Sequence, residues 1–251
     1  SPVKKYALEQ GLKILQPAKL KDPDFIEELR TLQADLQIVV AFRMLPEVVW
    51  AMPKLGTFNL HAALLPQYRG AAPINWAIIN GDTQTGITTF FLDHDIDTGN
   101  IIQRVPVPIL DTDNAEDVHD KLMVLGSDLV IETVDNIIAD NIHPIPQSAI
   151  ETNEPLRPAP KIFKETCRID WNKSVKNTYD FIRGLSPYPA AWTEITVNNK
   201  TSVLKIYATS KEFATVEAPV GRILTDGKSY LKVAQADGYQ NILTLQMAGK
   251  K

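Results

Sequence analysis

The amino-acid sequence predicts an α/β protein with a mostly parallel sheet in its first half and a small β-barrel in its second half. Strand-type and helix-type segments alternate up to about residue 140, and several short strand-type segments follow residue 190. A proline-rich stretch separates the two halves. We therefore expect a first domain at residues 1–142, a linker at 143–160 and a second domain at 161–251.

The first half alternates strands with helices. Its expected strands are short, apolar and rich in β-branched or aromatic residues: 37–42, 57–61, 86–93 and 101–109. Its expected helices space apolar residues by three and four: 23–33, 72–80 and the segment that starts at Asn114. This alternation is typical of a largely parallel sheet with helices on both faces.

The second half follows a stretch that contains Pro144, Pro146, Pro155, Pro158 and Pro160. Prolines at this density favour an extended, semi-rigid linker. One helix is then expected at 172–183, ended by Gly184 as the first residue beyond it. Short strands are expected near 190–197, 202–208, 219–225, 229–235 and 240–247, a spacing typical of a small barrel or sandwich.

The composition is that of an ordinary globular chain, with 44% hydrophobic and 22% charged residues. The sequence contains no apolar run long enough for a transmembrane helix and no signal-peptide pattern. Its single cysteine, Cys167, allows no intramolecular disulfide, and no cysteine and histidine cluster has zinc spacing. These features favour a cytoplasmic protein without a metal ion.

The charge is distributed unevenly along the chain. Residues 1–150 hold 11 Lys and Arg against 20 Asp and Glu, whereas residues 151–251 hold 15 against 10. A basic module attached to an acidic one is common where the basic part binds a polyanion. Ordinary surface charge in a small domain explains the same numbers, so the charge pattern alone leaves both interpretations open.

Asn59 and His61 are the most informative polar residues of the first half. In a strand over 57–61 they point to the same side, because side chains alternate in direction. Asp97 lies in an acidic loop after the next expected strand. If the two strands are parallel neighbours, His61 and Asp97 meet at the same edge of the sheet.

These three side chains suit acyl transfer to an amine. The Asn59 amide can donate to the oxygen on which negative charge develops. His61 can donate to the same oxygen or move a proton from the amine to the leaving nitrogen. Asp97 can orient the imidazole, raise its pKa or hold a water molecule. A hydrogen-bonded structural pair at Asn59 and His61 is the alternative that the pattern by itself leaves open.

The segment Phe58–Pro73 resembles the signature of formyltransferases that use formyltetrahydrofolate: Asn-x-His, then a Leu-Leu-Pro loop and Arg-Gly-Ala-x-Pro. The resemblance continues through 80–82 and 85–86 and closes with Asp-Thr-Gly at 97–99. It implies a Rossmann-like catalytic domain in which Asn59, His61 and Asp97 are the catalytic residues. Ala63 is a departure, because the family usually has serine there.

Within this superfamily the chain is similar to methionyl-tRNA formyltransferases. Residues 168–187 resemble the start of their second domain, a small barrel of oligonucleotide-binding (OB) type that contacts tRNA. The resemblance implies transfer of the formyl group of 10-formyltetrahydrofolate to the α-amino group of methionyl-tRNA for translation initiation. It implies a monomer whose partners are charged initiator tRNA and folate. It also implies that the family's first strand–helix–strand is missing ahead of Ser1, so that the catalytic domain is incomplete at its start.

The resemblance also indicates binding residues. Residues 41–45 match the loop that packs on the folate pterin, and the expected contacts to the formyl donor are Ala41, Phe42, Arg43, Met44, Leu45, Leu64, Leu65, Pro66, Leu92 and Asp93. The expected contacts to tRNA are basic residues near the start of the second domain and one beside the catalytic strand: Lys161, Lys164, Arg168, Lys173, Lys176 and Arg69.

Other functions share parts of this pattern. A sugar-nucleotide N-formyltransferase has the same three catalytic residues and a similar second domain. A formyltetrahydrofolate dehydrogenase shares the fold but requires further domains downstream. A non-catalytic RNA-binding protein would use only the second domain, and the presence of all three of Asn59, His61 and Asp97 argues against it.

Overall fold

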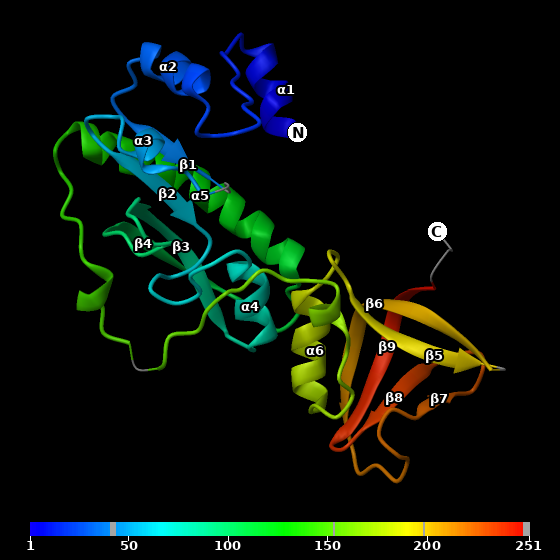
Figure 1. Cartoon of the computed structure of the whole chain (residues 1–251). Helices are drawn as coiled ribbons and strands as arrows, with labels where there is room; N and C mark the ends of the chain where they lie inside the picture. The colour runs from blue at the N-terminus through cyan, green and yellow to red at the C-terminus, as the bar shows by residue number, and fades with distance from the viewer. Residues whose placement is uncertain (41–43, 153, 198, 248–251) are drawn as a thin grey trace.

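In the computed structural model, the chain forms two β-sheets that are separated by the helices α4 and α6 (Figure 1). The structure describes residues 1–40, 44–152, 154–197 and 199–247. The first sheet contains β1 (Gln37–Val39), β2 (Thr57–His61), β3 (Gln84–Phe91) and β4 (Ile101–Pro108), in that spatial order. Each of the strands expected in the first half is therefore present, with ends shifted by a few residues.

The expectation of a mostly parallel sheet is wrong for the described strands. β1 pairs with β2 in parallel, but β2 with β3 and β3 with β4 are antiparallel. Parallel neighbours need a crossover connection of a dozen or more residues. The connection between β3 and β4, residues 92–100, is shorter than that, so these two strands form a hairpin.

Helix α5 (Ala115–Ile138) lies along this first sheet and provides much of its core. Asn114 caps it: its side chain accepts from the backbone N–H of Asp117, and the Asp117 carboxylate accepts from the backbone N–H of Asn114. Its expected start at Asn114 is confirmed. A Cβ on Gly126 would come within 2.8 Å of the Leu60 side chain, so a glycine lets α5 approach β2 closely.

The remaining helices of the first half are shorter. α3 (Glu47–Trp50) and α4 (Pro73–Ile79) flank β2 in the sequence. α1 (Pro2–Glu9) and α2 (Pro23–Thr31) lie on the β1 side of the sheet and bury none of their own residues (Figure 1). The helices expected over 23–33 and 72–80 are thus confirmed as α2 and α4, whereas the sequence pattern did not reveal α1 or α3.

The second sheet is a curled antiparallel sheet in the order β5-β6-β9-β8-β7. Its strands are β5 (Ala191–Val197), β6 (Lys200–Phe213), β7 (Ile223–Thr225), β8 (Leu231–Gln235) and β9 (Gly238–Met247). Each corresponds to a strand expected from the sequence. Between α5 and this sheet the chain forms two short 3-10 helices, η1 (Gln147–Ala149) and η2 (Glu165–Cys167), and then α6 (Val175–Gly184).

Helix α6 contacts α4 at Gly184, which is the last residue of α6 and not, as expected, the first residue beyond it. A Cβ on Gly184 would lie 2.8 Å from Cγ1 and 3.0 Å from the backbone nitrogen of Ile79. The Asn75 amide donates to the Gly184 carbonyl at 2.7 Å. The glycine therefore permits close packing of two helices.

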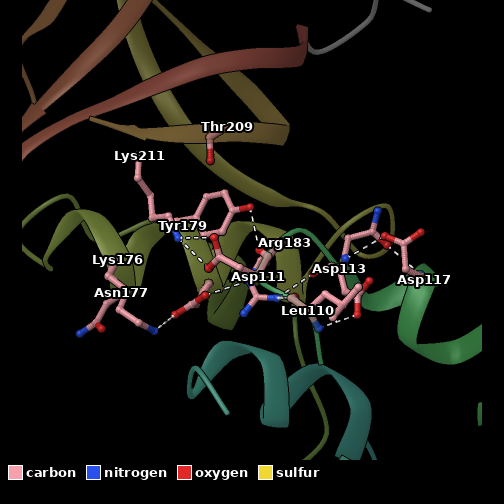
Figure 2. Close-up of polar contacts among 12 residues, drawn as sticks. Leu110, Asp111, Asp113, Asp117, Lys176, Asn177, Tyr179, Arg183, Thr209 and Lys211 are labelled. Carbon is pink, nitrogen blue, oxygen red and sulfur yellow. Dashed lines mark hydrogen bonds and ion pairs between the residues drawn. The ribbon is translucent and has the colours of Figure 1, made fainter. Parts of the chain in front are cut away.

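A buried arginine strengthens the junction between the two sheets (Figure 2). Arg183 donates to Oδ1 of Asp180 at 2.8 Å, to the Leu110 carbonyl at 3.1 Å and to the Asp113 carbonyl at 2.7 Å. Arg183 is 8% exposed and Asp180 is 1% exposed. The arginine thus ties α6 to the turn that precedes α5.

Asp111 makes a second set of contacts across the same junction (Figure 2). The Tyr179 hydroxyl donates to its carbonyl at 2.9 Å. The Lys211 ammonium donates to both carboxylate oxygens at 2.7 and 2.8 Å, and it holds the pKa of that carboxyl below its usual range. Both α6 and β6 therefore contact the same turn of the first half.

Candidate active site

His61 is held by contacts on both sides of its ring. Its Nε2 lies 2.8 Å from the Tyr68 carbonyl, and its Nδ1 lies 3.8 Å from Oδ2 of Asp97. A carbonyl oxygen can only accept, so Nε2 must carry a hydrogen. In the neutral imidazole, Nδ1 then has a free lone pair, and this lone pair is available to accept a proton.

The surroundings of His61 favour this neutral form. His61 is 6% exposed, and burial lowers the pKa of its imidazole below the usual value of 6.5. The negative charge of Asp97 and the hydrogen bond to the Tyr68 carbonyl oppose part of this decrease in pKa. His61 is therefore a neutral base near pH 7, close to a carboxylate that can stabilise its protonated form.

Asp97 reaches His61 by a route that the sequence analysis did not expect. β2 and β3 are antiparallel, so the end of β3 lies beside Phe58, at the start of β2. The loop after β3 folds back toward His61 and brings the carboxylate within 2.9 Å of the backbone N–H of Gly70. Asp97 adopts a φ of +56°, which is uncommon for a residue other than glycine.

Asn59 lies on the same face of β2 as His61 and lines the same cavity. It is 4% exposed, and its Oδ1 has no hydrogen-bond partner among the described residues. Buried amides are usually paired, so an unpaired one that faces a cavity is a suitable partner for a bound ligand. The structure thus places all three predicted catalytic residues around one cavity.

This cavity has a volume of about 1640 Å³. One side of it is apolar, formed by Met44, Leu45, Pro46, Trp50 and Leu92. Apolar walls with a few polar groups are typical of small-molecule sites. The volume exceeds the roughly 300–1,000 Å³ that is usual for a site that binds one small molecule.

The residues expected to bind the formyl donor differ in their placement. Met44, Leu45, Leu92 and Asp93 line the cavity. Ala41, Phe42 and Arg43 lie outside the described residues. His94 is exposed, but it also lines the cavity, and its ring packs edge-on against Trp50.

Leu64, Leu65 and Pro66 are not part of the cavity lining, as far as the chain is described. Leu65 is fully buried against Phe90 and Ile101. The Leu64 side chain lies over Gly86, where a Cβ would come within 2.4 Å of it. This loop is held in the protein core, so its predicted contact with the donor has no support from the geometry.

The predicted tRNA contacts also fall into two groups. Arg168 pairs with Glu194 at 2.9 Å and Lys176 with Asp180 at 2.6 Å, whereas the Arg69 guanidinium donates to Gln147. Lys161, Lys164 and Lys173 are exposed and form no ion pair within the described part of the chain. Free lysines are the better candidates for phosphate contacts.

Sequence reasoning missed the backbone groups that hold the site. The Tyr68 carbonyl and the Gly70 N–H contact His61 and Asp97, yet every residue other than proline has both groups. The run of small residues from Gly70 to Ala72 was an available signal of a tight loop. Gln147, whose side chain donates to the carbonyls of Asp97 and Gly99, had no recognisable sequence signal.

The described residues contain no group of three or more His, Cys, Asp or Glu side chains that could hold a metal ion. No helix among them is long and apolar enough to cross a membrane.

Two family models match the chain. Residues 1–134 match the model described as formyl transferase, and residues 161–251 match that of the formyl transferase C-terminal domain. The chain belongs to the formyl transferase family.

Relatives with much higher identity carry a more specific name. Over 253 residues the chain is 72% identical to a protein of Phocaeicola vulgatus named methionyl-tRNA formyltransferase, and the match covers 100% of this chain and 78% of that protein. A protein of Bacteroides thetaiotaomicron with the same name is 66% identical, with the same two coverages.

Solved structures share the fold at lower identity. The N-formyltransferase from Helicobacter canadensis, solved in complex with folinic acid and dTDP-3-aminofucose, aligns with a TM-score of 0.66 and 20% identity. The alignment covers 96% of this chain and 82% of that one. This similarity supports the fold and says nothing about the substrate.

Proposed function

We propose that this chain transfers the formyl group of 10-formyltetrahydrofolate to the α-amino group of initiator methionyl-tRNA, the tRNA used for translation initiation. The observation that supports this most is the arrangement of Asn59, His61 and Asp97 around one cavity. The chain's similarity along its whole length to proteins named methionyl-tRNA formyltransferase indicates which amine enters that cavity. The protein acts in the cytoplasm, and its active form is a monomer.

The reaction is a direct attack of the amine on the formyl carbon. Negative charge develops on the formyl oxygen, and a side-chain N–H of Asn59 can donate to it, a contact commonly worth about 3–4 kcal/mol in the transition state. The C–N bond to the folate then breaks, and the formyl group stays on the amino group of methionine. Asn59 suits this role because it is 4% exposed, lines the cavity and has a side-chain amide with N–H donors.

His61 moves the proton. Its Nδ1 lone pair accepts a proton from the attacking amine, and the same nitrogen returns it to the departing nitrogen of the folate. The hydrogen bond from Nε2 to the Tyr68 carbonyl selects this tautomer. Asp97 stabilises the imidazolium that forms between the two transfers, because its carboxylate lies 3.8 Å from Nδ1.

The folate lies with its pterin against the apolar side of the cavity. Leu45 and Leu92 form the walls of this site, and Asp93 follows Leu92 in the same loop. The exposed Met44 extends the apolar wall outward. The fit rests on this apolar wall and on the buried, polar Asn59 side chain, which lines the same cavity.

The second sheet binds the tRNA, as a barrel of OB type. Residues 151–251 hold five more basic than acidic residues, whereas the first half is acidic. The exposed Lys161, Lys164 and Lys173 supply phosphate contacts, with Arg168 and Lys176 beside them. Arg69, which follows the catalytic strand in the sequence, contacts the acceptor end of the tRNA with the part of its guanidinium that does not donate to Gln147.

A salt titration tests the tRNA surface. Replacing Lys161, Lys164 and Lys173 together with alanine is expected to weaken tRNA binding and to flatten its salt dependence, because fewer counterions are released. The slope of log K against log salt should decrease by about 0.7–0.9 for each lysine that contacts a phosphate. The KM for the formyl donor should not change, since the lysines do not line the cavity.

The matched control replaces Lys200, Lys205 and Lys228, which are exposed lysines on other parts of the second half. Its slope should stay near that of the wild type. If the first variant and the wild type have the same slope, the basic surface is ordinary solvated charge and the proposed tRNA surface is wrong.

The test of the function is formyl transfer from 10-formyltetrahydrofolate to two acceptors in parallel assays. Charged initiator methionyl-tRNA should be formylated, and a dTDP-linked amino sugar should not. Preference for the amino sugar would refute the proposal in favour of a sugar-nucleotide N-formyltransferase. Transfer to neither acceptor, under conditions where folate binds, would contradict both.

A further inference from the structure

Gln147 connects the two loops that contact the catalytic residues. Its Nε2 donates to the Asp97 carbonyl at 2.8 Å and to the Gly99 carbonyl at 2.9 Å. Its Oε1 accepts from Nε and Nη2 of Arg69 at 3.0 and 2.6 Å. A glutamine side chain has two donor hydrogens and two acceptor lone pairs, so all of its capacity is used. Gln147 is only 5% exposed, so water has little access to these hydrogen bonds.

Both loops hold their catalytic contact in an unfavourable backbone conformation. Asp97 has a φ of +56° and Tyr68 a φ of +60°. Such residues persist only where the surrounding structure determines their conformation. Gln147 bonds to the carbonyls of Asp97 and Gly99 on one loop and to Arg69, the neighbour of Tyr68, on the other.

The loop that contains Tyr68 is held from its other side by residues 157–159. The Tyr68 N–H donates to the Arg157 carbonyl at 2.7 Å, and the Ala71 N–H donates to the Ala159 carbonyl at 2.7 Å. A Cβ on Gly70 would lie 2.4 Å from the Ala159 carbonyl oxygen. The 68–72 loop is thus held by residues 157–159 as well as by Gln147. Gln147 also donates to two carbonyls of the other loop, so Asp97 is the catalytic residue whose position should depend most on Gln147.

We infer that Gln147 is a positioning residue for the formyl transfer: it holds the Asp97 loop so that the carboxylate stays beside Gly70 and His61. The inference rests on the proposed function for its kinetic consequence. Gln147 does not line the cavity, and its two donors and two acceptors are satisfied within the protein. It acts on the reaction through Asp97.

The first test is Gln147→Met, which keeps the length of the side chain and removes its hydrogen bonds. We expect kcat to decrease roughly 10- to 100-fold, the effect of misplacing a catalytic group by about 1 Å, with little change in the KM of the formyl donor. Gln147→Glu is the second variant. It keeps both acceptor contacts to Arg69 but cannot donate to the two carbonyls, so its kcat should fall similarly.

The matched control is Gln103→Met. The Gln103 side chain also makes two hydrogen bonds: its amide donates to Glu132 at 2.6 Å and accepts from the Thr133 hydroxyl at 2.6 Å. It joins β4 to α5 and does not line the cavity. Its loss should lower the melting temperature to a similar degree and leave kcat unchanged. A kcat for Gln147→Met and Gln147→Glu equal to that of Gln103→Met would overturn the inference.

A double-mutant cycle separates positioning from general structural damage. In an Asp97→Asn background, Gln147→Met should reduce kcat little further, because the group that it positions is already lost. The two single effects on kcat would multiply if Gln147 acted independently of Asp97, and that result would contradict the inference.

A measurement without substrate distinguishes this inference from the proposed function. The titration of the His61 ring, followed by NMR, should shift in Gln147→Met in the same direction as in Asp97→Asn and should not shift in Gln103→Met. An unshifted His61 in Gln147→Met refutes the positioning role whichever amine the protein formylates. Failure of the wild type to formylate methionyl-tRNA, with the His61 shift present, refutes only the proposed function.

Discussion

Replacing His61 with alanine is expected to reduce kcat for formyl transfer by about 10²–10⁴-fold, the usual contribution of a general base. The Nδ1 lone pair that accepts the amine proton is lost, while Asn59 still stabilises the oxygen. The KM for the formyl donor should change little, because the apolar wall formed by Leu45 and Leu92 is untouched. Steady-state assays with varied donor and varied methionyl-tRNA measure these quantities.

His143→Ala is the control, since His143 is exposed and lies outside the cavity. It should keep the full kcat. A His61→Ala variant with near-normal kcat would show that His61 is a structural residue and that its contact with Asp97 has another purpose.

If His61 is the base, it should also set the pH dependence of the reaction. His61 must be neutral to accept a proton, so kcat/KM should fall as the pH decreases through its pKa, which burial places below 6.5. The Asp97 carboxylate raises that pKa, and Asp97→Asn should therefore shift the acidic limb of the profile to lower pH while it reduces kcat. A shift to higher pH would contradict the assignment.

The second large effect concerns stability and the junction drawn in Figure 2. Arg183→Met should lower the free energy of unfolding by about 3–5 kcal/mol, the usual cost of removing one partner of a buried ion pair. Asp180 would remain 1% exposed without its 2.8 Å contact to the guanidinium. The carbonyls of Leu110 and Asp113 would lose donors as well. Denaturant unfolding monitored by fluorescence measures the loss.

Two variants serve as controls for this prediction. Arg168→Met removes an exposed ion pair with Glu194 and should cost only about 0–1 kcal/mol. Arg183→Met combined with Asp180→Leu also removes the buried carboxylate, which Arg183→Met leaves paired with Lys176 alone, and should recover part of the lost stability. A double variant less stable than Arg183→Met would show that the carboxylate is stabilised by Lys176 alone and that Arg183 acts mainly through the carbonyls.

The sequence pattern indicated every described strand and the helices α2, α4, α5 and α6, and it singled out residues with the chemistry for the proposed reaction. The α5 helix was predictable because its cap and its apolar spacing are local features. Asn59 and His61 were predictable as a pair because side chains alternate along β2, and the structure places both at one cavity. Periodicity and residue type are properties of short segments, so they can be read from the sequence without knowledge of the rest of the fold.

Tertiary structure alone decided how those segments are arranged. Alternation of side chains is the same in parallel and antiparallel strands, so the direction of β3 and the route of Asp97 to His61 could not be read from it. The contact between Arg69 and Gln147 joins residues 78 positions apart, and no local pattern predicts that these two side chains meet. The Tyr68 carbonyl holds His61 with a group that nearly every residue possesses, and only the path of the backbone brings that carbonyl to the imidazole.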